Sequence, residues 1–335
     1  MLIRGRENKL VLPPSLTGEN MKVQIEDKYF HYGYHKPIRY YWLKKMLYPI
    51  MNLFFHLLTT FIPRDQRKTK HFFSLVLIFK DEAPYLREWI EYHLLLGADH
   101  FYLYQNNSTD NYLSVIQPYI EKELITLVEW PEYPGQYSAY LNWYKTFRNE
   151  TRWVSFIDID EFICPISDTT LQEVMSRYEK YPVVLTYWKL FGTNGNLMHN
   201  TGIPVIEQYT NCRPKLFTEG KIIYNTYFDA ASEFISMHYL EIKWHCIKIP
   251  PVNTFKKFII WELHRVNKKN QPYIQLNHYW SKAFECWKKK YEKGSIEKGI
   301  KYKDFDFFKR LEFACTSTDH TIWRFLTLLK LRLKE

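Results

Sequence analysis

The chain has 335 residues, of which 46% are hydrophobic and 24% are charged, with a net charge of +10. This composition is typical of a globular protein, and it excludes intrinsic disorder over most of the chain. The 11 glycines and 16 prolines exclude collagen-like and low-complexity sequence. Aromatic residues make up 18% of the chain, which favours a thick core and sites that stack ring-shaped ligands.

The positive charge is concentrated at the two ends. Residues 1–70 carry 13 Lys and Arg against 5 Asp and Glu, and residues 282–335 carry 14 against 8. Residues 71–281 carry 19 against 23. Basic ends favour contact with phosphates of nucleic acids or of anionic lipids, whereas the acidic middle argues against a nucleic-acid groove through the main domain. The five cysteines form no CxxC motif, which argues against structural zinc and favours a reducing compartment.

Residues 1–25 lack the apolar run of a secretory signal, so we expect none there. The first apolar stretch is Met46–Ile62, whose large side chains recur at helical spacing between basic residues on both sides. Three interpretations of this stretch stay open: a helix packed on the main domain, a helix lying in a membrane interface, and a membrane span.

Strand and helix patterns alternate from residue 72 onward. Mainly apolar runs predict strands over 74–79, 100–104, 124–129 and 153–157, with helices between them over 84–96, 109–120 and 136–149. Further predicted elements are a helix over 169–179 capped by Asp168, a strand over 182–188, a charged helix over 283–293 and a basic amphipathic helix over 321–334. The alternation predicts an α/β fold with a mostly parallel sheet and helices on both faces.

Three carboxylates follow directly on the fourth predicted strand. Asp158, Asp160 and Glu161 end the run RWVSFIDIDEF, at the kind of strand end where parallel sheets bind ligands. Such crowded carboxylates repel one another unless a cation neutralises them. Asp158 and Asp160 can both face one hard divalent ion, so the pattern predicts a Mn²⁺ or Mg²⁺ site.

The chain resembles glycosyltransferases of the GT-A fold, and most closely glycosyltransferase family 92 and its bacterial family 2-like relatives. The resemblance covers about residues 72–300 and rests on four ordered blocks, Leu77–Asp110, Trp153–Phe162, Tyr187–Gly195 and Leu276–Gly294. It implies a Rossmann-like GT-A domain over residues 71–300. A basic N-terminal extension over 1–70 and a basic helical tail over 301–335 would flank this domain.

The resemblance also implies roles for particular residues. The nucleotide would be bound by Lys80, Glu82, Asn107, Asp110 and Asp158, and the metal by Asp158, Asp160 and His278. Asp160 would thereby act in catalysis, and Lys282 would neutralise the diphosphate. An inverting enzyme also needs a base for the acceptor hydroxyl. Glu233 is the preferred candidate, with Asp229 and His238 as alternatives in the same part of the chain.

We therefore expect a metal-dependent, inverting glycosyltransferase that moves a sugar from a UDP-sugar to a glycan or glycolipid. The expected setting is the cytoplasmic face of a bacterial membrane, in lipopolysaccharide or capsule assembly, with peripheral membrane contact and no nucleic-acid partner. The alternatives are a Golgi-type galactosyltransferase anchored by residues 46–62 and a non-catalytic basic protein that binds membranes or nucleic acid. A glycoside hydrolase with paired carboxylates is a further rival that a chelator would distinguish.

Overall fold

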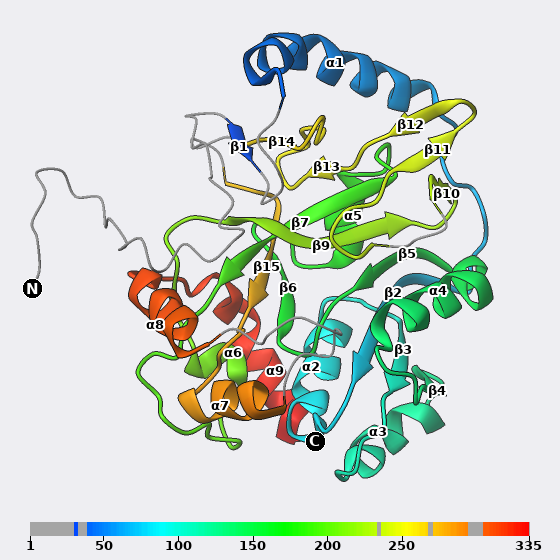
Figure 1. Cartoon of the computed structure of the whole chain (residues 1–335). Coiled ribbons are helices and arrows are strands. Elements are labelled where there is room, and N and C mark those ends of the chain that lie inside the picture. Colours follow the sequence, from blue (N-terminus) through cyan, green and yellow to red (C-terminus); the bar gives the residue numbers. More distant parts are fainter. Residues whose placement is uncertain (1–29, 33–38, 233–235, 267–270, 294–303, 335) are drawn as a thin grey trace, which may run out of the picture.

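The computed structural model describes residues 30–32, 39–232, 236–266, 271–293 and 304–334 (Figure 1). Its α-helices are α1 (Tyr41–Phe61), α2 (Ala83–Leu95), α3 (Tyr112–Glu121), α4 (Gln136–Thr146), α5 (Leu171–Ser176), α6 (Val205–Gln208), α7 (Phe284–Lys293), α8 (Phe305–Ala314) and α9 (Leu326–Lys334). Two 3₁₀-helices lie at Arg148–Glu150 and Thr321–Phe325.

The strands begin with β1 (Phe30–Tyr32) and end with β16 (Ser317–Thr318). Those of the large sheet are β2 (His71–Phe79), β3 (His100–Gln105), β4 (Ile125–Glu129), β5 (Thr151–Phe156), β6 (Glu161–Pro165), β7 (Val183–Leu190), β9 (Phe217–Asn225), β13 (Val252–Asn253) and β15 (Ile274–His278). Shorter strands outside it are β8 (Asn211–Cys212), β10 (Asp229–Ala230), β11 (Ile242–Trp244), β12 (Ile247–Ile249) and β14 (Leu263–Arg265).

The large sheet has the order β4-β3-β2-β5-β9-β7-β15-β6, with β13 paired beside β7. Strands β2 to β5 are parallel, as are β7, β13 and β15, whereas β9 and β6 run against their neighbours. The predicted mostly parallel sheet is therefore confirmed. The predicted strands and helices from residue 72 to 157 are present within a few residues of their expected ends.

Helices cover both faces of the sheet, as predicted. In β3, Phe101 contacts Trp89 of α2, whereas the next residue, Tyr102, contacts Trp143 of α4. Because neighbouring side chains of a strand point to opposite faces, α2 and α4 must lie on opposite sides of the sheet. The α/β class with helices on both faces is thus confirmed.

The sheet is curled, and its strand order shows why. The chain passes from β5 to β6 through residues 157–160, although β9, β7 and β15 lie between these strands. Four strand spacings in a flat sheet need about 19 Å, whereas five residue steps reach at most about 17 Å. The Glu161 N–H also bonds back to the Asp158 carbonyl at 3.0 Å, which shortens the path further. Only a curled sheet brings the two strand ends together.

One predicted helix end is wrong. The helix expected over 169–179 is shorter, α5, and its N-cap is Thr170, whose hydroxyl accepts the Glu173 N–H. Asp168 does not cap it, because the Asp168 carboxylate forms a two-pronged ion pair with Arg177, with N···O distances of 2.6 and 2.7 Å. The charged partner outcompetes backbone N–H groups for this carboxylate.

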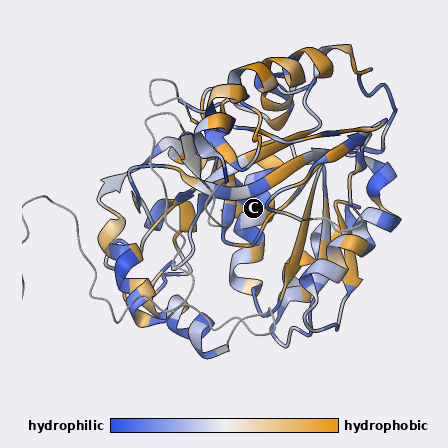
Figure 2. Cartoon of the chain, turned by 45° about the horizontal axis from the view of Figure 1, so that its top comes forward, coloured by the Kyte–Doolittle hydropathy of each residue, from blue (hydrophilic) through white to orange (hydrophobic). Residues whose placement is uncertain are grey.

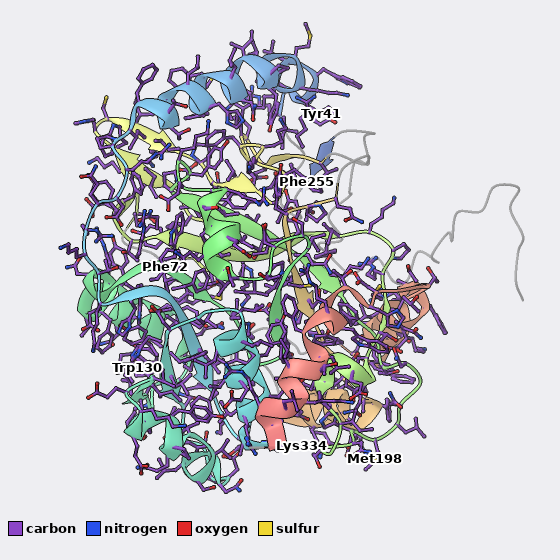
Figure 3. All side chains as sticks on the ribbon, turned by 180° about the vertical axis from the view of Figure 1, so that it is seen from behind. Tyr41, Phe72, Trp130, Met198, Phe255 and Lys334 are labelled. Atoms are coloured by element: carbon purple, nitrogen blue, oxygen red, sulfur yellow. The ribbon has the colours of Figure 1, made fainter. Side chains whose placement is uncertain are left out.

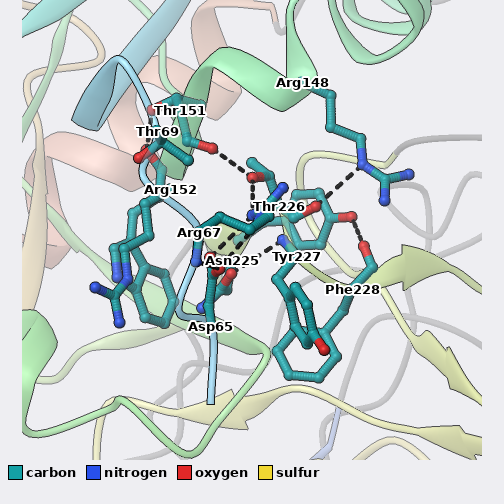
Figure 4. Close-up of polar contacts among 12 residues, drawn as sticks. Asp65, Arg67, Thr69, Arg148, Thr151, Arg152, Asn225, Thr226, Tyr227 and Phe228 are labelled. Atoms are coloured by element: carbon teal, nitrogen blue, oxygen red, sulfur yellow. Dashed lines mark hydrogen bonds and ion pairs between the residues drawn. The ribbon is translucent and has the colours of Figure 1, made fainter. Parts of the chain in front are cut away.

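The segment between α1 and β2 is fastened to the domain by a polar cluster (Figure 4). Arg67 pairs with Asp65 at 2.9 Å and also donates to the Thr226 hydroxyl at 2.9 Å. The Thr226 carbonyl accepts from Arg148 at 3.0 Å, and the Thr226 hydroxyl donates to the Thr151 carbonyl. This cluster holds residues 65–67 against the turn after β9, at the amino end of β5.

His93 gives the fold a defined acid sensitivity. This fully buried residue of α2 bonds through Nδ1 to the Trp89 carbonyl at 2.8 Å, while Nε2 accepts the Ile163 N–H at 3.3 Å. Burial lowers the pKa of His93 to about 3. Between pH 6.5 and pH 3, His93 is therefore protonated in the unfolded chain but not in the folded chain. The stability of the fold falls as the pH falls through that window.

We expect this histidine alone to remove about 2 kcal/mol of stability between pH 7 and pH 5. The His93→Gln variant, which keeps a donor and an acceptor but no titration, should lose correspondingly less over the same interval. Urea unfolding at both pH values measures the difference. His320→Gln, at an exposed histidine, is the control and should behave as the parent. Equal pH dependence of His93→Gln and the parent would contradict the assignment.

Candidate active site

The candidate site lies at the carboxyl ends of the parallel strands. Phe79 of β2 pairs with Gln105 of β3, and Val76 of β2 pairs with Phe156 of β5, so the loops that follow these strands leave the same edge of the sheet. Of the predicted nucleotide-binding residues, Lys80 follows β2, Asn107 follows β3 and Asp158 follows β5. The topology therefore gathers residues that are distant in the sequence at one edge.

The loops after β2 and β3 are bonded to each other. The Asp110 carboxylate accepts the Ala83 N–H at 2.8 Å and the Tyr112 N–H at 3.3 Å, at the starts of α2 and α3. The Asp81 carboxylate in turn accepts the Thr109 N–H at 2.7 Å. Asp110 thus acts here as a connector between two helix starts, and it fixes the shape of the loop pair.

The other predicted nucleotide residues in these loops differ in exposure. The Lys80 side chain is exposed at the end of β2, and Glu82 is half-buried at the residue before α2. Asn107 is exposed and donates its amide to the Pro131 carbonyl at 3.2 Å. Lys80 and Asn107 are therefore accessible to a ligand from solvent.

The acidic turn is neutralised by a buried lysine that the sequence interpretation missed. Lys221 of β9 is 1% exposed, and its Nζ lies 2.8 Å from Asp158 Oδ2 and 3.7 Å from Glu161 Oε2. Burial opposes the charge of Lys221, but the two carboxylates outweigh it and raise the pKa of Lys221. The one signal in the sequence is a lysine directly before the apolar residues of the run KIIYN, 63 residues from Asp158.

Glu161 belongs to the frame of the turn. Its side chain is fully buried, and its carboxylate accepts the Trp188 Nε1–H at 2.6 Å and the Asp158 N–H at 2.8 Å. Burial raises the pKa of Glu161, although Lys221 acts in the opposite direction. Because both oxygens are engaged inside the protein, Glu161 fixes the positions of Asp158 and Trp188.

Gly220 allows Lys221 to reach this turn. The register of β7 and β9 shifts between Tyr187 and Trp188, opposite Gly220. A Cβ at Gly220 would lie 1.7 Å from the Thr186 carbonyl oxygen, which no side chain tolerates. Glycine therefore lets the two strands approach beside the site.

Asp160 lies between a lysine and a histidine. Its Oδ2 accepts a hydrogen bond from Lys290 of α7, and its Oδ1 lies 3.6 Å from Nε2 of His278 at the end of β15. Burial alone would raise the pKa of Asp160, but Lys290 and Lys282 hold it well below its usual range. Asp160 is therefore an anion at all physiological pH values, although its side chain is only 7% exposed.

His278 is neutral in this setting. Burial lowers the pKa of His278 to about 4, although the Asp160 charge acts in the opposite direction. Its Nδ1 is buried and has no hydrogen-bond partner among the described residues. A neutral imidazole beside a buried carboxylate is the form of histidine that binds metal ions.

Two of the three predicted metal ligands, Asp160 and His278, are placed to hold a divalent ion. Asp160 Oδ1 and His278 Nε2 lie 3.6 Å apart, close enough for both residues to hold one divalent ion. Asp158, the third predicted ligand, is held by Lys221 instead. Within the described part of the chain, no three His, Cys, Asp or Glu side chains already surround one point. Asp160 and His278 would therefore hold the ion together with substrate phosphate and water, as Mg²⁺ sites commonly do.

Lys282 lies beside this pair but has a different partner. It is 1% exposed, and its Nζ lies over the Tyr85 ring at 3.9 Å from the ring centre. Burial and the charge of Lys290 lower the pKa of Lys282, while Asp160 and Glu82 oppose that shift. Lys282 therefore lies against the first turn of α2, beside the acidic turn. Lys289, in contrast, is 70% exposed and pairs with Glu285 on the helix surface.

The three candidates for the catalytic base differ in where they lie relative to the site. Glu233 lies outside the described residues. Asp229 pairs with Arg148 at 2.6 Å, next to the polar cluster at the amino end of β5, so it is not brought to the site. His238 is brought there: its ring lies 5.5 Å from the Trp188 ring, and its Nδ1 bonds to the Gly220 carbonyl at 2.7 Å. Burial lowers the pKa of His238 to about 4, so it is unprotonated at neutral pH.

Comparisons with known proteins identify the family. Glycosyltransferase family 92 matches residues 75–306, which is more than half of the chain. A family 92 protein of Oryza sativa subsp. japonica is 32% identical over 117 residues, covering 35% of this chain and 20% of the relative. A family 92 protein of Ricinus communis is 24% identical over 240 residues, covering 70% and 40%. Galactan beta-1,4-galactosyltransferase GALS2 of Arabidopsis thaliana is 28% identical over 106 residues, covering 29% and 20%.

Among solved structures, Staphylococcus aureus TarS 1–349 matches with 18% identity and a TM-score of 0.33, covering 46% of this chain and 47% of that one. The matches to the three plant relatives span between a fifth and two fifths of each relative's length. The family match contains all four blocks of the sequence resemblance, since it begins at Leu75 and ends beyond Gly294. On this match, the chain belongs to glycosyltransferase family 92.

Proposed function

We propose that this protein transfers a hexose from a UDP-sugar to a glycan acceptor and needs Mn²⁺ or Mg²⁺ to do so. The observation that carries the proposal is the Asp160–His278 pair, an ionised carboxylate and a neutral imidazole 3.6 Å apart, at a strand edge within the family match. Galactose is the favoured sugar, because one relative is named a galactosyltransferase.

The reaction needs stabilisation of the diphosphate that leaves the sugar. A bound divalent ion supplies that stabilisation as a Lewis acid, with Asp160 and His278 as its protein ligands. Lys282 and Lys290 add positive charge next to Asp160. Lys80 and Asn107, accessible at the ends of β2 and β3, contribute donors and Glu82 an acceptor to the nucleotide.

We propose an inverting mechanism with His238 as the described candidate for the base. The unprotonated ring has its Nδ1 fixed by the Gly220 carbonyl, which leaves Nε2 to accept the proton of the acceptor hydroxyl. Glu233, the base preferred from the sequence, lies in the segment before it. The anomeric configuration of the product, measured by NMR, tests this part independently.

The acceptor is proposed only as a glycan. A setting in bacterial lipopolysaccharide or capsule assembly was expected from the sequence, but the curated relatives named above are plant proteins. They give that setting no support.

The test is donor turnover with a defined metal. The full chain is incubated with UDP-galactose and a galacto-oligosaccharide, and UDP release and product length are followed with Mn²⁺, with excess EDTA, and after Mn²⁺ is restored. We expect EDTA to reduce turnover at least about 100-fold and added Mn²⁺ to restore it. Turnover that resists EDTA would contradict the metal role, and cleavage of the oligosaccharide without UDP-galactose would favour a glycoside hydrolase.

A further inference from the structure

Helix α1 faces the protein with a side that carries both polar and apolar residues. Its buried residues are Tyr48, Asn52, Phe55 and Thr59. The Tyr48 hydroxyl donates to the Phe258 carbonyl at 2.6 Å, and the Asn52 side-chain oxygen accepts the Phe258 N–H at 3.1 Å. These two bonds satisfy the backbone of one residue of the domain, so rolling the helix about its axis would leave buried polar groups unpaired.

The opposite side of α1, which we name the outer face, is apolar over its whole length. Ten of its eleven exposed residues are apolar and none is charged: Trp42, Leu43, Met46, Leu47, Pro49, Ile50, Leu53, Phe54, Leu57, Thr60 and Phe61. Several are highly exposed, with Met46 at 76% and Phe61 at 82%. Figure 2 shows this helix along one edge of the molecule, with hydrophobic colouring over much of its length and hydrophilic stretches between. A contiguous apolar surface of this length marks an interaction site rather than a free surface.

We propose that the outer face of α1 lies in the interface of an anionic lipid bilayer. Basic side chains border this face at its start, where Lys44 and Lys45 follow Trp42. Lys45 Nζ lies 5.0 Å from the Trp42 ring centre, an arrangement in which the ammonium reaches the head groups while the ring sits at their base. At the other end, Lys180 Nζ lies 3.4 Å from the Thr60 hydroxyl, and Arg64 is exposed just beyond the helix.

The charge pattern favours a bilayer over a second copy of this chain. Both ends of the outer face carry positive charge, so two copies that meet face to face, in either direction, bring like charges together. An anionic leaflet complements both ends at once, with roughly 1 kcal/mol per exposed Lys or Arg. Among the described residues, no helix is long and apolar enough to cross a membrane. The arrangement is that of a helix that lies on the membrane with its apolar side down.

The helix is also held firmly enough to carry the domain. Besides the bonds to Phe258, the ring of Phe55 contacts the ring of Phe258 at 5.3 Å, and the His56 ring bonds to the Tyr181 hydroxyl at 3.1 Å. The following segment is fastened at Asp65 and Arg67 by the cluster in Figure 4. Binding through α1 would therefore fix the orientation of the whole domain on the membrane.

The test is co-sedimentation of the full chain with vesicles. Phosphatidylcholine vesicles with and without phosphatidylglycerol are compared for the parent and the triple variant Met46→Ser, Ile50→Ser, Leu53→Ser. We expect the parent to bind the anionic vesicles, to bind them less as the salt concentration rises and the screening length shortens, and to lose at least about tenfold in partitioning in the triple variant. The matched control is Leu197→Ser, Met198→Ser, two residues about as exposed but outside α1, and it should bind as the parent.

Circular dichroism and size-exclusion chromatography of each variant complete the experiment. Equal vesicle binding by the parent and the triple variant would overturn the proposal. So would a parent that ignores the vesicles and forms a dimer that the triple variant loses, which would assign the outer face to a second copy. A monomeric parent that does not bind the anionic vesicles overturns it as well.

Discussion

The Asp160→Asn enzyme should keep its fold and lose about 10²- to 10³-fold in kcat. Asn retains the size of the side chain but removes the negative charge that Lys290 and His278 now face. With that charge removed, one of two proposed protein ligands of the metal is lost and the diphosphate is left with less stabilisation. Turnover of UDP-galactose at saturating Mn²⁺ measures the loss, and a kcat within about threefold of the parent would refute the role of Asp160.

We also expect Asp160→Asn to lower the stability of the folded protein at neutral pH. Because Lys290 and Lys282 depress the pKa of Asp160, its charge stabilises the folded state above the unfolded pKa near 3.8, and this contribution is lost as the pH falls below it. We expect the Asn variant to be about 1–3 kcal/mol less stable at pH 7, and the difference to shrink in acid. The matched control is Asp306→Asn, an exposed carboxylate that pairs with Lys309 in α8, which should retain turnover.

Replacing Lys221 with Met should destabilise the protein by about 3–5 kcal/mol, because it leaves buried carboxylates without their cation. The lysine pairs with Asp158 at 2.8 Å and with Glu161 at 3.7 Å. The double variant Lys221→Met, Asp158→Asn removes the charge on both sides of the shorter pair. It should therefore recover at least about 1 kcal/mol relative to the sum of the single changes. Urea unfolding of the four proteins gives this coupling energy.

Lys282→Met is the matched control for this cycle, since Lys282 is equally buried. Its pKa is lowered in the folded protein, which means that its charge is a cost to stability rather than a gain. Removing it should leave stability equal or higher, although donor binding weakens if Lys282 faces the diphosphate. A Lys282→Met variant as unstable as Lys221→Met would show that any buried lysine in this region is structural, and would remove the distinction between them.

The sequence predicts the first half of the sheet well because those strands are buried on both faces. Runs such as 74–79 and 153–157 are apolar except for one serine each, and a polar turn or a helix start follows each. Strand β9 is not predicted, although it occupies the centre of the sheet between β5 and β7. It contains Gly220 and Lys221, which break the apolar pattern, and both are present because of the site rather than the core.

The acidic residues of the candidate site were predicted from the sequence, but their ion-pair partners were not. Asp158 and Asp160 were identified from the acidic run at the end of a predicted strand, whereas His278 was implied only by the resemblance to the family. Their cationic partners are distant: Lys221 is 63 residues from Asp158, and Lys290 is 130 residues from Asp160. No local pattern encodes such a pairing, because it depends on which strands become neighbours. The position of Asp229 could not be predicted for the same reason, since the chain places it beside Arg148, at the amino end of β5.

The position of α1 has a consequence for the reach of the enzyme. The helix leads into the amino end of β2, whereas the acidic turn and His278 lie at the carboxyl ends of the strands; Figure 3 shows Tyr41, at the start of α1, and Lys334, at the end of α9, at opposite ends of the molecule. The nine residues of β2 span about 30 Å. A domain that rests on α1 would hold its catalytic edge up to about that height above the lipid. If α1 rests on the bilayer as proposed, a sugar attached directly to a lipid head group would lie too low, and the arrangement would favour acceptors whose growing end projects far from the bilayer.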